Sequence, residues 1–316
     1  MLIYNPRAGK FGRDGKSKVA RAVKILEDRG HQVTVAATTG PRTAGGIARE
    51  YIDRGAGLIL AAGGDGTINE VAEGMLHTDV PLGILPAGTA NVLAMEMKLG
   101  SRFERAAERL DQLVPRRVSV GHVVCDGGAV SRHFLLMAGA GLDAHIVYHV
   151  DGFLKSHVGK FAYWAAGWSM LGRRLPQLQV QACGRQFPCS FALASKVRNY
   201  GGDFEIARSV TLFEDTFEVV LFEGRTSLPY VKYFFGMAAN RLQGMKGVTM
   251  LRTSNLKVTG AESPDVYVQI DGEFAGRLPA ELRVVPEALT LLAPADYGVP
   301  ERQAVVAGQV GASVQT

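Results

Sequence analysis

The feature of this sequence that most constrains its fold is an apolar run that passes directly into a glycine-rich turn and then into a helical segment. Residues 57 to 71 read GLILAAGGDGTINEV, with Gly63, Gly64 and Gly66 around Asp65. A buried strand that ends in such a turn and opens a helix points backbone N–H groups outward, where anions such as phosphate bind. Glycine permits close approach of a phosphate chain. A purely structural turn capped by Asp65 remains an alternative interpretation of the same residues.

Strand and helix patterns alternate through the first 118 residues. Short strands are expected at 2–4, 31–38, 57–62 and 81–85, and helices at 16–29, 43–54, 68–75 and from about 91. This alternation is typical of a parallel sheet covered by helices on both faces. After residue 118 the strand patterns follow one another closely, which predicts a second domain with an antiparallel sheet. The final residues, 300–316, are small and polar without periodicity and are expected to be disordered.

Composition limits the class of protein and its partners. A chain of 316 residues that is 47% hydrophobic is long enough for two cores. The net charge of +5 indicates an anionic partner such as phosphate or an acidic lipid surface. No run of five or six like charges is present, so we do not expect nucleic-acid binding. Three cysteines without a CxxC spacing indicate neither a disulfide framework nor a zinc site and fit a reducing cytoplasm.

The N-terminal residues lack the pattern of a signal peptide, and no apolar stretch approaches the roughly 20 residues that span a bilayer. The chain is therefore expected to be soluble or peripheral to a membrane. One helical stripe combines Phe161, Trp164, Ala165, Trp168 and Leu171 with basic residues at its ends. Core packing and a position in a membrane interface both explain it.

Two further glycine-rich turns follow strands of the first domain. The loop NPRAGKFGRDGKSK carries Lys10, Arg13 and Lys16, and the turn PAGTANVLA carries Thr89 and Asn91. Two common phosphate-binding fingerprints are excluded, because a GxGxxG motif would need glycine where Asn69 stands and no GxxxxGK[ST] occurs. Three turns at the same edge of one sheet predict a phosphate-binding site there.

A pair of carboxylates ends a strand of the second domain. The segment VYVQIDGEFAGRLP alternates apolar residues up to Asp271, Gly272 and Glu273, which predicts a hairpin turn. Phosphoryl transfer to an alcohol needs a group that accepts the hydroxyl proton, and either carboxylate can serve. Taken alone, the pair is better explained as a solvated hairpin turn.

Seven segments together resemble a known family. The sequence is similar to the bacterial lipid kinases of the diacylglycerol kinase catalytic-domain superfamily, which includes sphingosine and ceramide kinases, in NPRAGK (5–10), TTG (38–40), GGDGTINEVAEGM (63–75), PLGILPAGTAN (81–91), GAGLDA (139–144), NYGGDFEIA (199–207) and VQIDGE (268–273). The GGDGT core is shared with NAD kinases and phosphofructokinases, whereas the NEV continuation and GTAN point to the lipid branch. The match runs in order over about residues 2 to 295.

The resemblance implies an α/β nucleotide-binding domain, similar to NAD kinase and phosphofructokinase, at 1–118, and a C-terminal antiparallel β-sandwich lipid-substrate domain at 119–287. The last strand, about 288–298, is expected to return to the first domain. ATP is the implied cofactor. The implied ATP contacts are Asn5, Pro6, Arg7, Ala8, Gly9, Thr38, Gly63, Gly64, Asp65, Gly66, Thr67, Ile68, Asn69, Glu70 and Thr89.

The resemblance also implies catalytic and metal residues. Asp271 is the expected base with Glu273 as the close alternative, and Asp65 is expected beside the nucleotide-bound Mg²⁺. A second, structural metal site maps to Leu212, Asp215 and Phe217, but the family's DDG reads EDT here, so Glu214 is an alternative to Asp215. Ser119 stands where many members carry an aspartate, which puts that site in doubt.

The sequence thus predicts an ATP- and Mg²⁺-dependent kinase that phosphorylates a hydroxyl of a membrane lipid, most simply a diacylglycerol, at the inner face of the cytoplasmic membrane. Diacylglycerol, phosphatidylglycerol and sphingoid bases remain open as acceptors, and a homodimer is possible. An NAD kinase-type enzyme and a catalytically silent lipid- or nucleotide-binding regulator are the alternatives.

Overall fold

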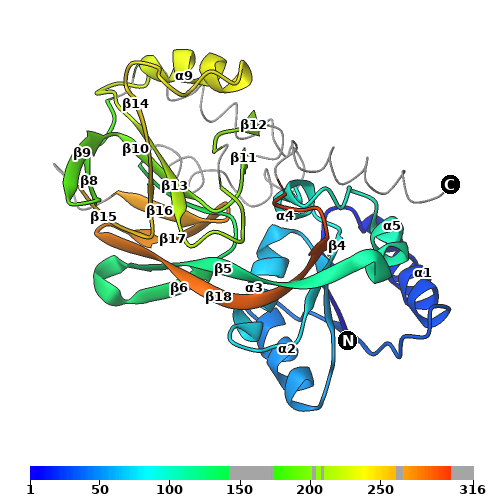
Figure 1. The fold of residues 1–316 in the computed structure, drawn as a ribbon. Coiled ribbons are helices and arrows are strands. Elements are labelled where there is room, and N and C mark those ends of the chain that lie inside the picture. Colours follow the sequence, from blue (N-terminus) through cyan, green and yellow to red (C-terminus); the bar gives the residue numbers. More distant parts are fainter. Residues whose placement is uncertain (142–171, 173, 201–203, 208–209, 261–265, 300–316) are drawn as a thin grey trace, which may run out of the picture.

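The computed structural model describes residues 1–141, 172, 174–200, 204–207, 210–260 and 266–299. The amphipathic stripe at 160–171, part of the GAGLDA segment and the tail at 300–316 lie outside these residues. The expected combination of a parallel α/β half and an antiparallel β-sandwich half is confirmed (Figure 1). Within the described residues, no helix has the length and apolar character needed to cross a bilayer.

The N-terminal half is a parallel sheet between two layers of helices. Strands β1 (Leu2–Tyr4), β2 (Val35–Ala37), β3 (Ile59–Gly63) and β4 (Leu82–Pro86) pair in parallel in the order β2-β1-β3-β4. Successive side chains of each strand point to opposite faces of the sheet, so each strand contributes residues to the cores on both faces. Ile3, Ile59 and Ile84 lie in one core with α2 (Ala44–Asp53) and α3 (Asp65–Met75), whereas Leu2, Leu60 and Leu85 lie in another with α1 (Gly15–Glu27) and α5 (Phe103–Glu108).

Helices α2 and α3 pack with their backbones in direct contact. A Cβ atom on Gly45 would lie 2.6 Å from the carbonyl oxygen of Glu70, and one on Gly74 would lie 2.1 Å from the carbonyl oxygen of Gly45. Gly46, the next residue of α2, is exposed and has open space where its Cβ would be. The two neighbouring glycines therefore serve different purposes.

We predict opposite effects of alanine at these two positions. Gly45→Ala forces the helices apart and should lower the free energy of unfolding by about 1 to 3 kcal/mol. Gly46→Ala removes a flexible residue from an exposed helix and should raise it by up to about 1 kcal/mol. Urea unfolding followed by circular dichroism measures both. Equal effects of the two substitutions would contradict the close helix contact.

Two long strands join the halves. β5 (Leu113–Cys125) and β18 (Ala280–Pro294) pair antiparallel from Leu113 and Pro294 to Val124 and Glu281, and β18 also pairs in parallel with β4 through Leu291 and Leu82. The first sheet therefore continues as β4-β18-β15-β8-β9 into the C-terminal half. The expected boundary near residue 118 falls inside β5, so the halves share one continuous sheet and no linker separates them there.

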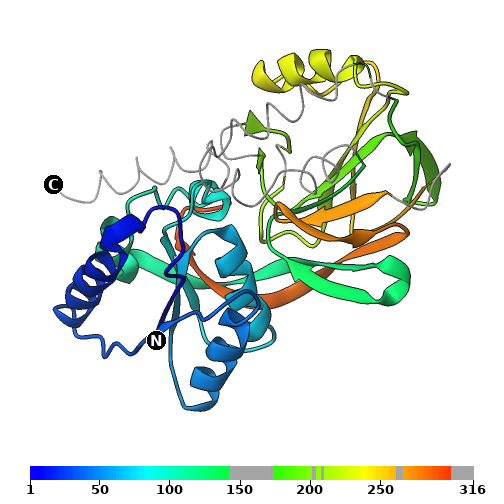
Figure 2. The same ribbon diagram turned by 180° about the vertical axis from the view of Figure 1, so that it is seen from behind.

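The C-terminal half packs this extension against a second, antiparallel sheet of order β14-β13-β10-β7-β16-β17 (Figure 2). Its interior contains Phe134, Val180 and Val258 on one side and Leu221 and Ile270 on the other, all buried. The strands are β6 (Val130–Phe134), β7 (Met137–Gly141), β8 (Leu178–Ala182), β9 (Arg185–Cys189), β10 (Phe191–Ser195), β13 (Phe217–Phe222), β14 (Val248–Thr253), β15 (Asn255–Gly260), β16 (Tyr267–Ile270) and β17 (Glu273–Arg277).

Short elements complete the described fold. They are η1 (Gly12–Asp14), α4 (Val92–Glu96), η2 (Leu110–Gln112), η3 (Asp126–Gly128), β11 (Asn199–Tyr200), β12 (Phe204–Glu205) and α9 (Pro229–Ala238). In both ribbon views α9 lies on the C-terminal half, away from α1 and α2.

Candidate active site

The three glycine-rich turns meet at the carboxyl ends of the parallel strands. A Cβ on Gly88 would lie 2.4 Å from the Cα of Gly64, and a Cβ on Gly9 would lie 3.0 Å from Oγ1 of Thr89. The turns after β1, β3 and β4 are thus in contact, as the sequence predicts. Because Gly64 and Gly88 have no side chains, the backbones of the turns after β3 and β4 approach each other closely.

Helix α3 begins three residues earlier than the hydrophobic pattern indicates. Gly64 is its extended N-cap, with φ of −89° and ψ of 179°, and supplies no side-chain cap. Asp65 consequently lies in the first helical turn, where an acidic side chain interacts favourably with the helix dipole. The GGDGT turn is therefore the N-terminus of an eleven-residue helix, a favourable site for a phosphate group.

The first loop is fixed against this turn by hydrogen bonds. Asn5 donates from Nδ2 to Oγ1 of Thr67 at 3.1 Å and accepts the N–H of Arg7 at its Oδ1 at 2.9 Å. Pro6, Arg7, Gly9 and Thr89 are exposed around the turns, whereas Ala8 is buried in the core. Thr38 continues from β2 and donates its N–H to the carbonyl of Tyr4 at 2.9 Å.

Three residues of the stretch expected to contact ATP make structural contacts around the site. Ile68 is fully buried, and Asn69 donates from Nδ2 to the carbonyl of His133 on β6 at 3.1 Å. Glu70 accepts the N–H groups of Arg42 and Ala44 at 2.8 and 3.3 Å and so caps α2. Their positions follow from the helical period, which turns them away from the N-terminal end of α3.

Asp65 is held at the start of another helix. Its Oδ1 accepts the N–H of Leu93 at 3.2 Å. Burial raises the pKa of Asp65, and the backbone N–H groups around α4 oppose that rise. A carboxylate in this setting gains from a nearby cation, because burial penalises its charge.

Asp271 reaches the same place from the C-terminal half. It forms the hairpin turn between β16 and β17 with Gly272, at φ of 48° and 78°. Three consecutive backbone N–H groups, those of Leu135, Leu136 and Met137, donate to its carboxylate at 2.9 Å each. Burial raises the pKa of Asp271 to about 7, and the charge of Asp65 adds to the rise. The carboxylates of the two halves are thus close enough to influence each other.

Glu273 lies directly over the GGDGT turn. A Cβ on Gly66 would lie 2.5 Å from its Oε1, so a larger residue there would displace the end of the Glu273 side chain. The side chain of Glu273 is 48% exposed, and Oε2 lies 3.6 Å from Nη2 of Arg132. Arg132 and the amides at 135–137 could not be predicted from the sequence, since neither belongs to a motif.

The chemistry of the two aspartates fits a divalent cation bound together with a nucleotide. Carboxylate oxygens are preferred Mg²⁺ ligands, and Mg²⁺ commonly uses one or two of them together with phosphate oxygens. The described residues hold no cluster of three or more histidine, cysteine, aspartate or glutamate side chains suited to a metal. A nucleotide would therefore have to complete the coordination.

The loop expected to hold a structural metal has other partners. The carbonyl of Leu212 accepts the N–H of Ser119 at 2.9 Å, and Oδ1 of Asp215 accepts the hydroxyl of Ser119 at 2.5 Å. Phe217 is the first residue of β13. Ser119 thus donates hydrogen bonds to two of the three residues that are expected to supply oxygen ligands.

Comparisons with known proteins agree with this geometry. Residues 1–123 match the family described as diacylglycerol kinase catalytic domain, and residues 137–293 match the YegS C-terminal NAD kinase beta sandwich-like domain. The chain is 28% identical to a diacylglycerol kinase of Bacillus subtilis (strain 168) over 290 residues, covering 89% of this chain and 91% of the relative. It is 25% identical to a diacylglycerol kinase of Staphylococcus aureus (strain MRSA252) over 300 residues, covering 93% and 92%.

Solved structures share the fold. A diacylglycerol kinase from Bacillus anthracis str. Sterne superposes with a TM-score of 0.74 at 20% identity, covering 92% of this chain and 96% of that one. Yeast NADH kinase, solved with NADH, gives 0.51 at 11% identity, covering 100% and 89%.

Proposed function

Because the chain belongs to the diacylglycerol kinase catalytic-domain family, we propose that it is an ATP- and Mg²⁺-dependent lipid kinase. It transfers the γ-phosphoryl group to the hydroxyl of a membrane lipid, most simply a diacylglycerol. The position of Glu273 over Gly66 supports this proposal most directly, because it sets a carboxylate of one half against the phosphate-binding turn of the other.

The chain's own groups have separable tasks in this reaction. Backbone N–H groups at the start of α3 bind and orient the triphosphate, and the exposed Arg7 and Thr89 line its approach. Asp65 and Asp271 would hold the nucleotide-bound Mg²⁺, which supplies charge neutralisation on the phosphates when bound. The chemistry is mainly positioning and electrostatic stabilisation.

We propose Glu273 as the group that accepts the hydroxyl proton, in place of the Asp271 favoured by the sequence. Three N–H groups already donate to Asp271, so its orientation is fixed and most of its acceptor capacity is used. Glu273 has one distant partner, Arg132, and remains half exposed above the turn. In this assignment Asp271 would help to hold the nucleotide-bound Mg²⁺, and its hydrogen bonds fix the conformation of the hairpin turn.

Incubation of the purified protein with γ-labelled ATP and fractionated membrane lipids tests the proposed activity. We expect label in a lipid fraction, most strongly with diacylglycerol, and none on NAD. Labelled NADP would favour the NAD kinase-type alternative that the similarity to yeast NADH kinase raises. ATP binding without transfer to any acceptor would favour a regulator.

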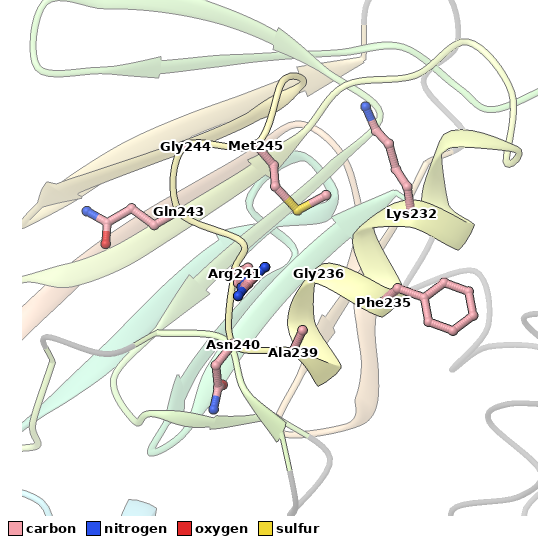
Figure 3. A pocket seen from close by; sticks show the side chains of 9 residues that line it. All are labelled: Lys232, Phe235, Gly236, Ala239, Asn240, Arg241, Gln243, Gly244 and Met245. Atoms are coloured by element: carbon pink, nitrogen blue, oxygen red, sulfur yellow. The ribbon is translucent and has the colours of Figure 1, made fainter.

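We further propose that α9 contacts the membrane. Leu228 and Phe235 are 60% and 62% exposed and share one helical stripe with Lys232 and Ala239, at spacings of four, seven and eleven residues. Figure 3 shows Lys232 and Phe235 extending from the helix beside a pocket lined by α9 and the following loop. Arg241 and Lys246 are exposed on that loop. Exposed apolar and basic side chains together favour an anionic lipid surface.

The double substitution Lys232→Glu/Phe235→Ser should weaken binding to vesicles containing phosphatidylglycerol on the order of 100-fold, since it reverses one charge and removes an inserted ring. Co-sedimentation with vesicles measures the binding. Lys257→Glu, which changes an exposed lysine of β15 paired with Glu281 on the neighbouring strand β18, is the control. Unchanged binding of the double variant, or equal binding to neutral vesicles, would contradict the proposal.

A further inference from the structure

The loop between β12 and β13 is in contact with a buried lysine that no part of the proposed reaction uses. Lys196 follows β10 and is fully buried, an unusual position for a lysine side chain. Its ammonium donates to the carbonyl oxygen of Glu214 and lies 3.4 Å from that of Thr216. These two carbonyls flank Asp215, the residue expected to ligate a structural metal.

The side chains around this loop already include as many basic groups as carboxylates, without a metal ion. Glu214 forms an ion pair with Arg252, and Arg252 also donates to Oγ1 of Thr216 at 2.9 Å. Lys196 brings a second basic group to this loop, because its Nζ donates to the carbonyls of Glu214 and Thr216 on either side of Asp215. Two carboxylates thus face two cations, and a divalent ion would add positive charge beside both.

The oxygen ligands fit a metal poorly for a second reason. Ser119 donates its N–H to the carbonyl of Leu212 and its hydroxyl to Asp215, and Asp215 is exposed. An aspartate in place of Ser119 would have supplied another anionic oxygen, whereas a serine supplies a donor. Ser119 thus competes with a divalent cation for the oxygens of Leu212 and Asp215.

We infer that the ammonium group of Lys196 is the cation that stabilises the loop 211–217, and that this loop is ordered without a divalent metal. The lysine side chain reaches the loop from the end of β10, and its N–H groups donate to the carbonyls of Glu214 and Thr216. The arrangement links β10 to the start of β13 and, through Ser119, to the long strand β5 that joins the two halves.

Thermal unfolding without nucleotide tests the inference. Lys196→Met keeps the length of the stem but removes the charge, and we expect the Tm to fall by about 5 to 10 °C. Lys257→Met, which removes the lysine of an exposed ion pair, should change the Tm by less than about 1 °C. A Lys196→Met protein as stable as the wild type would overturn the inference.

A second measurement does not depend on the folding of that variant. The Tm of the wild type and of Asp215→Asn is compared in EDTA and in excess MgCl₂ or CaCl₂. We expect the same metal response in both proteins, because Asp215 holds no ion. A rise in the Tm of the wild type on addition of metal, absent in Asp215→Asn, would show a divalent site and overturn the inference. Because neither measurement uses activity, their failure is distinct from failure of the proposed kinase function.

Discussion

Replacing Glu273 with glutamine should lower kcat by roughly 10²- to 10⁴-fold with the fold intact, since a general base contributes about that factor. Glutamine has nearly the same shape, and the half-exposed side chain of Glu273 makes one long ion pair, to Arg132. Stability should therefore change little. Initial rates with saturating ATP and lipid, together with the Tm, measure the two effects separately.

Two companion variants make this result specific. Glu281→Gln removes another exposed carboxylate, on β18, and should leave kcat unchanged. Asp271→Asn should lower both kcat and the Tm, because asparagine offers one acceptor oxygen to three N–H donors. If Glu273→Gln keeps full turnover while Asp271→Asn loses it, the proton goes to Asp271 and our assignment is wrong.

The parts of this molecule that the sequence predicts well are local. Each glycine-rich turn is defined by a few adjacent residues, and the hydrophobic patterns of β1, β3, β4 and α1 depend only on their own periods. The close contact of Gly64 with Gly88 then follows from the parallel order of the strands. Local patterns therefore locate the nucleotide-binding edge.

The parts that the sequence does not reveal depend on distant pairing. The continuity of β5 through both halves is fixed by its register with β18, more than 150 residues later in the chain. The N–H groups at 135–137 that hold Asp271 belong to the backbone and have no residue signature. Lys196 is similarly ordinary in sequence, and only its burial beside Glu214 and Thr216 indicates a role.

The choice between Asp271 and Glu273 illustrates the difference. Both carboxylates belong to one DGE turn, so residue type and spacing treat them alike. Their partners separate them, since Asp271 accepts three backbone N–H groups and Glu273 lies against Gly66. The roles proposed for these two residues thus depend on contacts between the two halves, which the residue types and spacing of the turn do not specify.

Asp65→Asn is the second substitution for which we expect a very large loss of activity, on the order of 10²- to 10³-fold in kcat, the usual effect of removing one electrostatic group from a transition state. The cause is the loss of a carboxylate that would hold the nucleotide-bound Mg²⁺. Asparagine retains an Oδ1 that can accept the N–H of Leu93, so the start of α4 should stay in place. Asp53→Asn, at an exposed carboxylate ending α2, is the control and should retain full activity.

The stability of Asp65→Asn relative to the wild type should increase with pH. Burial raises the pKa of Asp65 in the folded protein, so between its ordinary value and the raised value the native state keeps a proton that the unfolded chain has lost. Wild-type stability therefore falls as pH rises through that window. Asparagine has no proton to lose, and the Tm of the variant relative to the wild type should increase across the window and then level off. A Tm difference that does not change with pH would contradict the burial of the Asp65 carboxylate at the start of α3. A kcat equal to that of the wild type would contradict its proposed role in holding the nucleotide-bound Mg²⁺.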